Sequence, residues 1–178
     1  MYQTSANTVF FIPGSAKISV QSSVGSTTYT DIGSAQGIKL TETWGMADLE
    51  TLSMQSYYAP FKQEVSVEAD LLEYDFLKLY LMRGGIDSYS TAAGKVFTSG
   101  GLSSMYSLAY QIVNTGPTSS QAVTITIPWA HIAEAFTIPF AGDDQTDIAK
   151  MRFKITGVCQ STGTAGSMLY SITDTRTT

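Results

Sequence analysis

Residues able to carry out nucleophilic or acid-base chemistry are scarce in this sequence. It contains one histidine, His131, and one cysteine, Cys159. Catalysis by a nucleophile and its base needs at least two such groups brought together, so the usual constellations cannot be assembled. His131 stands among apolar residues and is predicted to be a packed or surface imidazole. Cys159 is predicted to be a small core side chain near a strand end, and a lone cysteine excludes an intrachain disulfide.

Carboxylates offer two further kinds of site. Glu64, Glu68 and Asp70 alternate along one expected strand, and a pair of carboxylates is sufficient to hydrolyse a glycoside. The acidic run at 143–147 has the oxygen ligands that Ca²⁺ prefers. No aromatic platform accompanies the strand carboxylates, and the acidic run lacks the full calcium-loop pattern, so we interpret both as solvated surface. The sequence therefore predicts no catalytic residue, no metal site and no cofactor.

Composition favours strands and a surface covered by neighbouring chains. Charged residues make up only 14% of the chain, against about 25% in ordinary soluble domains. Ser and Thr account for 44 of the 178 residues, and they favour strands and turns over helices. The net charge of −5 argues against a protein that grips nucleic acid by neutralising phosphates. We expect one domain over residues 1–178.

The N-terminal segment, about residues 1–15, is expected to be an arm. It has a short apolar run from Val9 to Ile12 and no basic region before it, so it is not a secretory signal. No stretch of the chain approaches the length of a membrane span, and we expect no membrane anchor.

Alternation of apolar and polar residues predicts most of the remaining elements to be strands. The cleanest pattern runs from Lys62 to Leu71, with four apolar residues on one face and the three carboxylates on the other. The polar segment 22–28 is predicted to be a turn. The other predicted strands are 17–21, 29–33, 37–44, 95–98, 105–114, 121–128, 148–160 and 168–173, and the range 129–147 has no readable pattern.

One helix is predicted at about residues 71–83. Asp70 and Glu73 have the spacing of a capping box, and Gly84-Gly85 provides a stop. Because nearly every side of this helix is apolar, we expect it to be buried between the sheet and a neighbouring subunit, through residues such as Phe76 and Tyr80.

Residues 45–60 are predicted to form a long irregular loop. This segment has apolar residues without a strand or helix period, and its only charges are Asp48 and Glu50. It is too apolar to remain in water, so we expect it to dock on another chain. Folding back over its own core is the alternative. Its apolar residues are Met46, Leu49, Leu52, Met54, Tyr57 and Tyr58.

The segment Thr27–Gly33, followed by Gly37–Leu40, resembles the opening of long-tailed phage tail tube proteins. In that family an early strand and a turn lead to a TYTDIG type of segment and a second strand. The subsequent order is also similar: a long loop, an acidic strand, one helix that ends at glycine, and further strands. The resemblance implies a mainly β fold, a β-sandwich or half-barrel of antiparallel strands with one flanking α-helix.

The resemblance also implies a function. Such proteins are structural rather than enzymatic, and they assemble into hexameric rings stacked as a tube, related to the inner tubes of contractile injection machines. It implies a place in the phage tail of the virion, assembled in the host cytoplasm, with tape measure and tail tip or terminator proteins as partners and DNA passing without specific binding. The loop 45–60 would bridge rings, Glu64, Glu68 and Asp70 would face the lumen, and the N-terminal contact would comprise Val9, Phe10, Phe11 and Ile12.

Two other interpretations remain open at this point. Another virion protein, such as a head decoration or connector protein, would share the Ser/Thr-rich β character and would bind preformed capsids without polymerising. A carbohydrate-binding or hydrolysing module would use the carboxylates of the acidic strand, and glycan binding would be lost when they are mutated.

Overall fold

The computed structural model of the chain describes residues 16–50, 56–72, 76–84, 88–92, 94–99, 107–115, 122–133, 151–159 and 169–175. For 46–50, 56–62 and 76 it describes the backbone alone. The elements, in chain order, are β1 (Ala16–Gln21), β2 (Tyr29–Glu50), β3 (Ser56–Leu71), α1 (Phe76–Met82), β4 (Ser88–Ser90), β5 (Val96–Thr98), β6 (Leu108–Thr115), β7 (Ala122–Ile132), β8 (Met151–Val158) and β9 (Ser171–Asp174).

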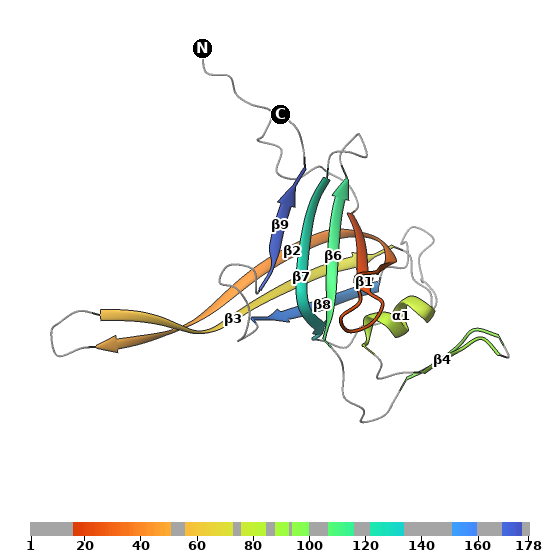
Figure 1. Cartoon of the computed structure of the whole chain (residues 1–178), viewed down its shortest axis with the longest axis horizontal. Helices are drawn as coiled ribbons and strands as arrows, with labels where there is room; N and C mark the ends of the chain where they lie inside the picture. The colour runs from red at the N-terminus through yellow and green to blue at the C-terminus, as the bar shows by residue number, and fades with distance from the viewer. Residues whose placement is uncertain are drawn as a thin grey trace, which may run out of the picture.

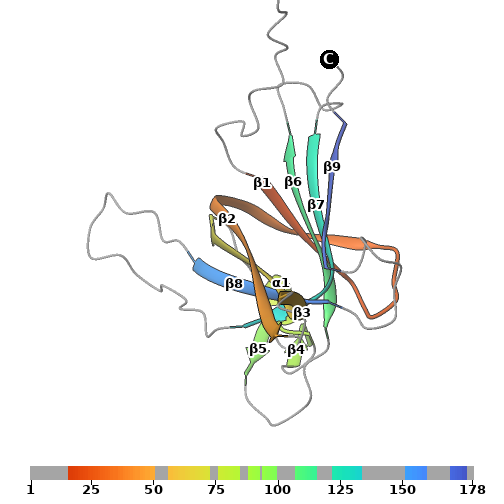
Figure 2. The same cartoon turned by 90° about the vertical axis from the view of Figure 1, so that its left-hand side faces the viewer.

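The main sheet closes on itself. Its strand order is β6-β1-β2-β3-β8-β7-β9, and a further pairing between β6 and β7 completes the ring, all of it antiparallel. Strands β6, β7 and β9 run across the direction of β2, β3 and β8 in both side views (Figures 1 and 2). The expectation of a mainly β fold of antiparallel strands with one flanking helix is confirmed.

One close approach fixes the corner where the ring closes. Strand β7 pairs with β9 through 123–126 and with β8 through 130–132, so it changes neighbours along its length. Gly157 of β8 lies at this change of neighbours. A Cβ there would meet Ile127 Cγ2 at 2.5 Å and Val65 Cγ1 at 2.9 Å. Only glycine lets the three strands come this close.

Glycines also bend the long strand β2. Between β1 and β2, Ile18 pairs with Gly33 and Ser19 with Asp31, which leaves Ile32 as the extra residue of a β-bulge. Gly33 has a φ of 138° and donates its N–H to Asp31 Oδ1 at 2.8 Å. This geometry accounts for the Asp-Ile-Gly of the TYTDIG segment: the carboxylate holds the bulge, the isoleucine is buried and glycine adopts the unusual φ.

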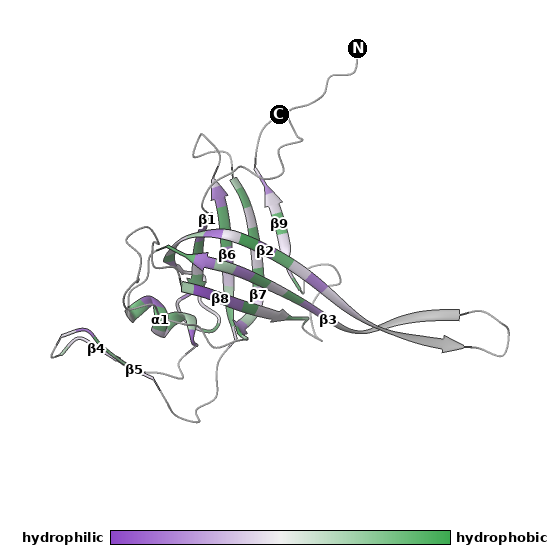
Figure 3. Cartoon of the chain, turned by 180° about the vertical axis from the view of Figure 1, so that it is seen from behind, coloured by the Kyte–Doolittle hydropathy of each residue, from purple (hydrophilic) through white to green (hydrophobic). Residues whose placement is uncertain are grey.

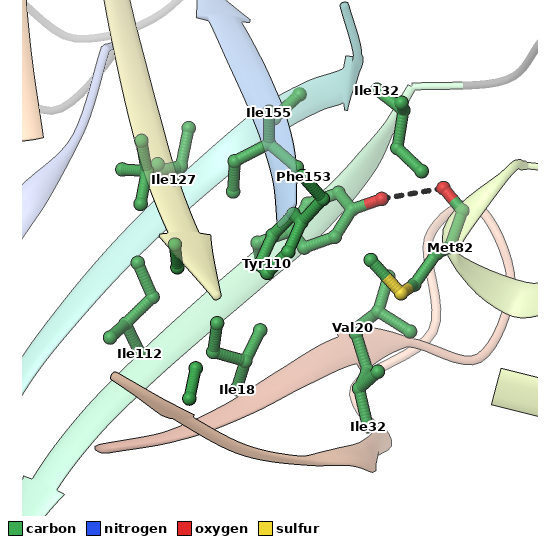
Figure 4. Packing of buried hydrophobic residues seen from close by; sticks show 14 of the residues in the cluster. Ile18, Val20, Ile32, Met82, Tyr110, Ile112, Ile127, Ile132, Phe153 and Ile155 are labelled. Carbon is green, nitrogen blue, oxygen red and sulfur yellow. Dashed lines mark hydrogen bonds between the residues drawn. The ribbon is translucent and has the colours of Figure 1, made fainter. Parts of the chain in front are cut away.

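The barrel interior is filled by the apolar positions that the alternation predicted. Ile18 and Val20 of β1, and the apolar face of the acidic strand, are buried. Tyr110 lies in the centre of this core and donates its O–H to the carbonyl of Met82 at 2.7 Å (Figure 4). This hydrogen bond joins the end of α1 to β6. The apolar face of the acidic strand comprises Val65, Val67, Ala69 and Leu71.

The described part of α1 spans Phe76–Met82. The predicted start at about residue 71 is wrong, because Leu71 still belongs to β3 and the Asp70 carboxylate pairs with Arg152 of β8. Its C-terminus is as expected: Gly84 has a φ of 61° and donates its N–H to the Leu81 carbonyl at 3.2 Å. The apolar side of α1 packs against the barrel, where Leu79 and Met82 are buried (Figure 3).

The prediction of an irregular loop at 45–60 is wrong for the described residues of that range. Strands β2 and β3 continue through it as an antiparallel ribbon, in which Gly45 pairs with Lys62 and Glu50 pairs with Ser56. The two predicted strands at 29–33 and 37–44 are accordingly one strand. We call 45–50 with 56–62 the arm, and Figure 1 shows that it projects from the barrel along the longest axis of the molecule.

A second, smaller projection lies at the other end of that axis. Strands β4 and β5 pair through three residues each, and only the second of them, predicted at 95–98, was expected. Tyr80 of α1 stacks on Tyr89 of β4 with ring centroids 6.4 Å apart, and Arg83 Nη1 donates to Ser99 Oγ at 2.6 Å. The two ends of the molecule are therefore different in shape (Figure 1).

Candidate functional site

The residues predicted to contact other subunits fall into three groups. Val9, Phe10, Phe11 and Ile12 lie outside the described residues, as do Leu52 and Met54. Met46 and Leu49 belong to β2 and pair with Pro60 and Tyr57, while Tyr58 of β3 pairs with Asp48, so all lie on the arm. Phe76 begins α1, and Tyr80 is half-buried at the other end of the molecule.

The arm is a ribbon without a third strand. Among the described residues, the outer edges of 45–50 and 56–62 pair with no further strand. Its backbone leaves the barrel, which therefore cannot cover both faces of the ribbon (Figure 1). Unpaired strand edges and a largely apolar sequence are features that proteins usually cover.

The exposed Trp44 marks the point where the arm leaves the barrel. Its side chain is 51% exposed, as is that of Ile172 on β9. Close to these two residues in sequence, the Tyr170 O–H donates to Glu42 Oε2 at 3.0 Å, which ties the chain entering β9 to β2. This hydrogen bond, with partial burial second, raises the pKa of Tyr170. Trp and Tyr at such a place are typical of binding hot spots.

The acidic face of β3 is paired with bases from the neighbouring strand. Lys154 Nζ lies 3.4 Å from Glu68 Oε1, and Arg152 Nε lies 3.2 Å from Asp70 Oδ1. Both pairs are in register across β3 and β8. Sequence reasoning identified the carboxylates and missed these partners, because alternation gives the face of a strand but not which strand lies beside it. The face is a ladder of ion pairs rather than a purely acidic stripe.

The remaining residues considered for chemistry are not brought together in one site. His131 pairs with Thr156 between β7 and β8, and Cys159 is exposed at the end of β8, not in the core as predicted. The acidic run at 143–147 lies outside the described residues. In the part of the chain that the structure describes, no cluster of three or more His, Cys, Asp or Glu side chains is placed to hold a metal ion. Nor does that part contain a helix long and apolar enough to cross a membrane.

Comparison with solved structures shows where this fold occurs. A chain of the sheath-tube complex of an extracellular contractile injection system, PVC, in its extended state aligns with a TM-score of 0.50 and 12% identity, over 87% of this chain and 95% of that one. The PVC sheath/tube terminator aligns at 0.47 with 10% identity, over 83% and 91%. The tube-terminating cap of the anti-feeding prophage aligns at 0.46 with 10% identity, over 88% and 87%.

This chain has the fold of that sheath-tube chain. The identity is too low to show more than the fold, and the alignment covers nearly the whole of both molecules. No protein-family model matches the sequence, and no curated protein does. The expected relation to tubes of contractile injection machines is thus supported at the level of fold, whereas the long-tailed phage family itself is not specifically indicated.

Proposed function

We propose that this chain is a structural, non-catalytic subunit that assembles with copies of itself into rings, six subunits to a ring, stacked as the tail tube of a phage or phage-like particle. The observation that carries the proposal is the arm. A two-stranded ribbon with no third strand or helix packed on it gains little stability of its own in water, so cover from another molecule would stabilise the arm. Copies of the same chain supply that cover when each arm lies on the next subunit.

The fold of the sheath-tube chain supports the same function. That structure is named for a complex of sheath and tube, and a tube needs heterologous contacts in which different surfaces of one subunit meet. The two different ends of this molecule are suited to such contacts (Figure 1). Tape measure, tail tip and terminator proteins would then be partners, and the virion would be its final location after assembly in the host cytoplasm.

The charge distribution supports a channel through which DNA passes without sticking. We propose that the face of β3 carrying Glu64, Glu68 and Asp70 lines the lumen. There Arg152 and Lys154 are each engaged by a carboxylate, so they offer little uncompensated positive charge to a phosphate backbone. The net charge of −5 also weakens any attraction of the chain for the phosphates of DNA.

Sedimentation velocity over a concentration series tests the proposal. We expect large species whose fraction grows with protein concentration. A single species of 19.2 kDa at every concentration contradicts self-assembly. A chain that binds preformed capsids and never associates with its own copies would favour the interpretation as a head decoration protein.

A further inference from the structure

The described part of the chain contains an open groove next to α1. It has a volume of about 400 Å³, within the range of binding pockets in proteins. The turn between β1 and β2, half-buried residues of α1 with the glycine that follows it, and the first residue of β6 form its walls. The lining residues are Ser22, Ser23, Val24, Tyr80, Leu81, Gly84 and Leu108. None is charged, which makes the groove unsuited to phosphate or to a charged metabolite.

Both walls of this groove are anchored to β6 by side-chain hydrogen bonds. The Gln21 amide accepts from the Ala109 N–H at 3.2 Å and donates to the Ser26 carbonyl inside the turn. The next residue of β6, Tyr110, holds the C-terminal end of α1 through Met82. Because each wall is tied to an adjacent position of one strand, the groove exists before anything binds in it.

The turn itself is also internally braced. The Ser26 N–H donates to the Ser23 carbonyl at 3.0 Å, and the Ser26 hydroxyl accepts from the Thr28 N–H at 3.0 Å. Val24 nevertheless stands out from this braced turn with 52% of its side chain exposed. Val24 therefore adds apolar surface at the rim of the groove, which a docked chain would cover.

We propose that this groove receives the arm of a second copy of the chain. The inference rests on the proposed function and specifies where the arm docks. The groove next to α1 lies on the side of the barrel away from the arm, so a head-to-tail arrangement of two copies can bring the arm of one towards the groove of the next (Figure 1). Both are poor in charge: the groove lining has none, and residues 45–60 carry only Asp48 and Glu50.

Blocking the groove tests this docking. Val24→Arg places a charge at the rim, where exposure leaves room for it, and circular dichroism checks that the variant folds. Leu77→Arg is the matched control, since Leu77 is 42% exposed on the same helix and does not line the groove. We expect the concentration needed for assembly to rise at least tenfold for Val24→Arg and to stay near wild type for Leu77→Arg.

A mixing experiment identifies the occupant. In a second variant, an Asn-Gly turn replaces residues 48–58 and joins Ala47 to Ala59, which already face each other across the ribbon. Each variant alone lacks one half of the contact. Mixed, the arm of the Val24→Arg chain meets the open groove of the shortened chain, and light scattering should show particles of about twice the mass of either variant alone.

The outcomes separate the two proposals. Wild-type protein that remains a monomer overturns the proposed function and the docking with it. Wild type that assembles, with Val24→Arg assembling equally well, overturns only the docking. Mixed particles that form when residues 1–12 are intact and fail when these are deleted assign the groove to the N-terminal segment, which also overturns the arm as its occupant.

Discussion

Gly33 ends the TYTDIG segment and has an unusual backbone conformation. Its φ of 138° is one that side chains with a Cβ rarely adopt, and it sits in the bulge that turns β2 around the barrel. We expect Gly33→Ala to lower the free energy of unfolding by about 1–3 kcal/mol, because the strain must be relieved by moving the bulge. Urea denaturation measures the change. The neighbouring Ser34→Ala is the control, and its free energy of unfolding should stay within about 0.5 kcal/mol of wild type. Equal stability of both variants would contradict this explanation of the bulge.

Tyr110 should make the protein sensitive to alkali. Burial raises the pKa of its phenol well above 10.0, so the folded state keeps a proton that the unfolded chain releases above that pH. Its contribution to stability is therefore fully present below pH 10 and declines as the pH rises further, by up to about 1.4 kcal/mol per pH unit.

Comparison with Tyr110→Phe isolates this effect from the other titrating groups. Losing the hydrogen bond to Met82 costs about 1–3 kcal/mol at pH 8. The stability advantage of wild type over the variant should shrink between pH 10 and pH 11.5 in urea titrations. An advantage that is constant over this range would show that the phenol ionises as easily in the folded state as in the unfolded one.

At the scale of elements, the closing corner of the barrel depends on Gly157. A methyl group there has nowhere to go between Ile127 and Val65, so Gly157→Ala should destabilise the fold by about 1–3 kcal/mol through overpacking. Thermal unfolding measures the effect, and Val158→Ala, whose side chain is exposed, serves as the control. A Gly157→Ala variant as stable as wild type would mean that β7 and β8 separate freely at this corner.

The elements that sequence predicted well are those with one buried face. The prediction of the acidic strand was correct because core contacts impose alternation on Val65, Val67 and Ala69. The arm was missed as a pair of strands because it lies away from the core, where no buried face imposes a period. The helix was predicted to start at about residue 71, whereas Leu71 still belongs to β3 and Asp70 pairs with Arg152 of the neighbouring strand β8. Such pairings join residues far apart in the chain, and alternation carries no information about them.

At the scale of the whole molecule, the arm and the barrel have separate roles. Replacing residues 48–58 with an Asn-Gly turn should leave the barrel folded, since core, bulges and closing corner lie outside the replaced segment. Far-ultraviolet circular dichroism and a cooperative thermal transition check folding, and sedimentation checks association. We expect a folded protein whose assembly stops short of tubes. An unfolded variant would show that the arm stabilises its own barrel, in agreement with the alternative that this segment covers its own core.

The most direct test of the central claim, that copies of this chain cover one another's exposed surfaces and so build a tube, is negative-stain electron microscopy of the purified wild-type protein at increasing concentration. The account predicts rings with a central hole and, at higher concentration, stacks of them. Uniform small particles without rings at every concentration would contradict it.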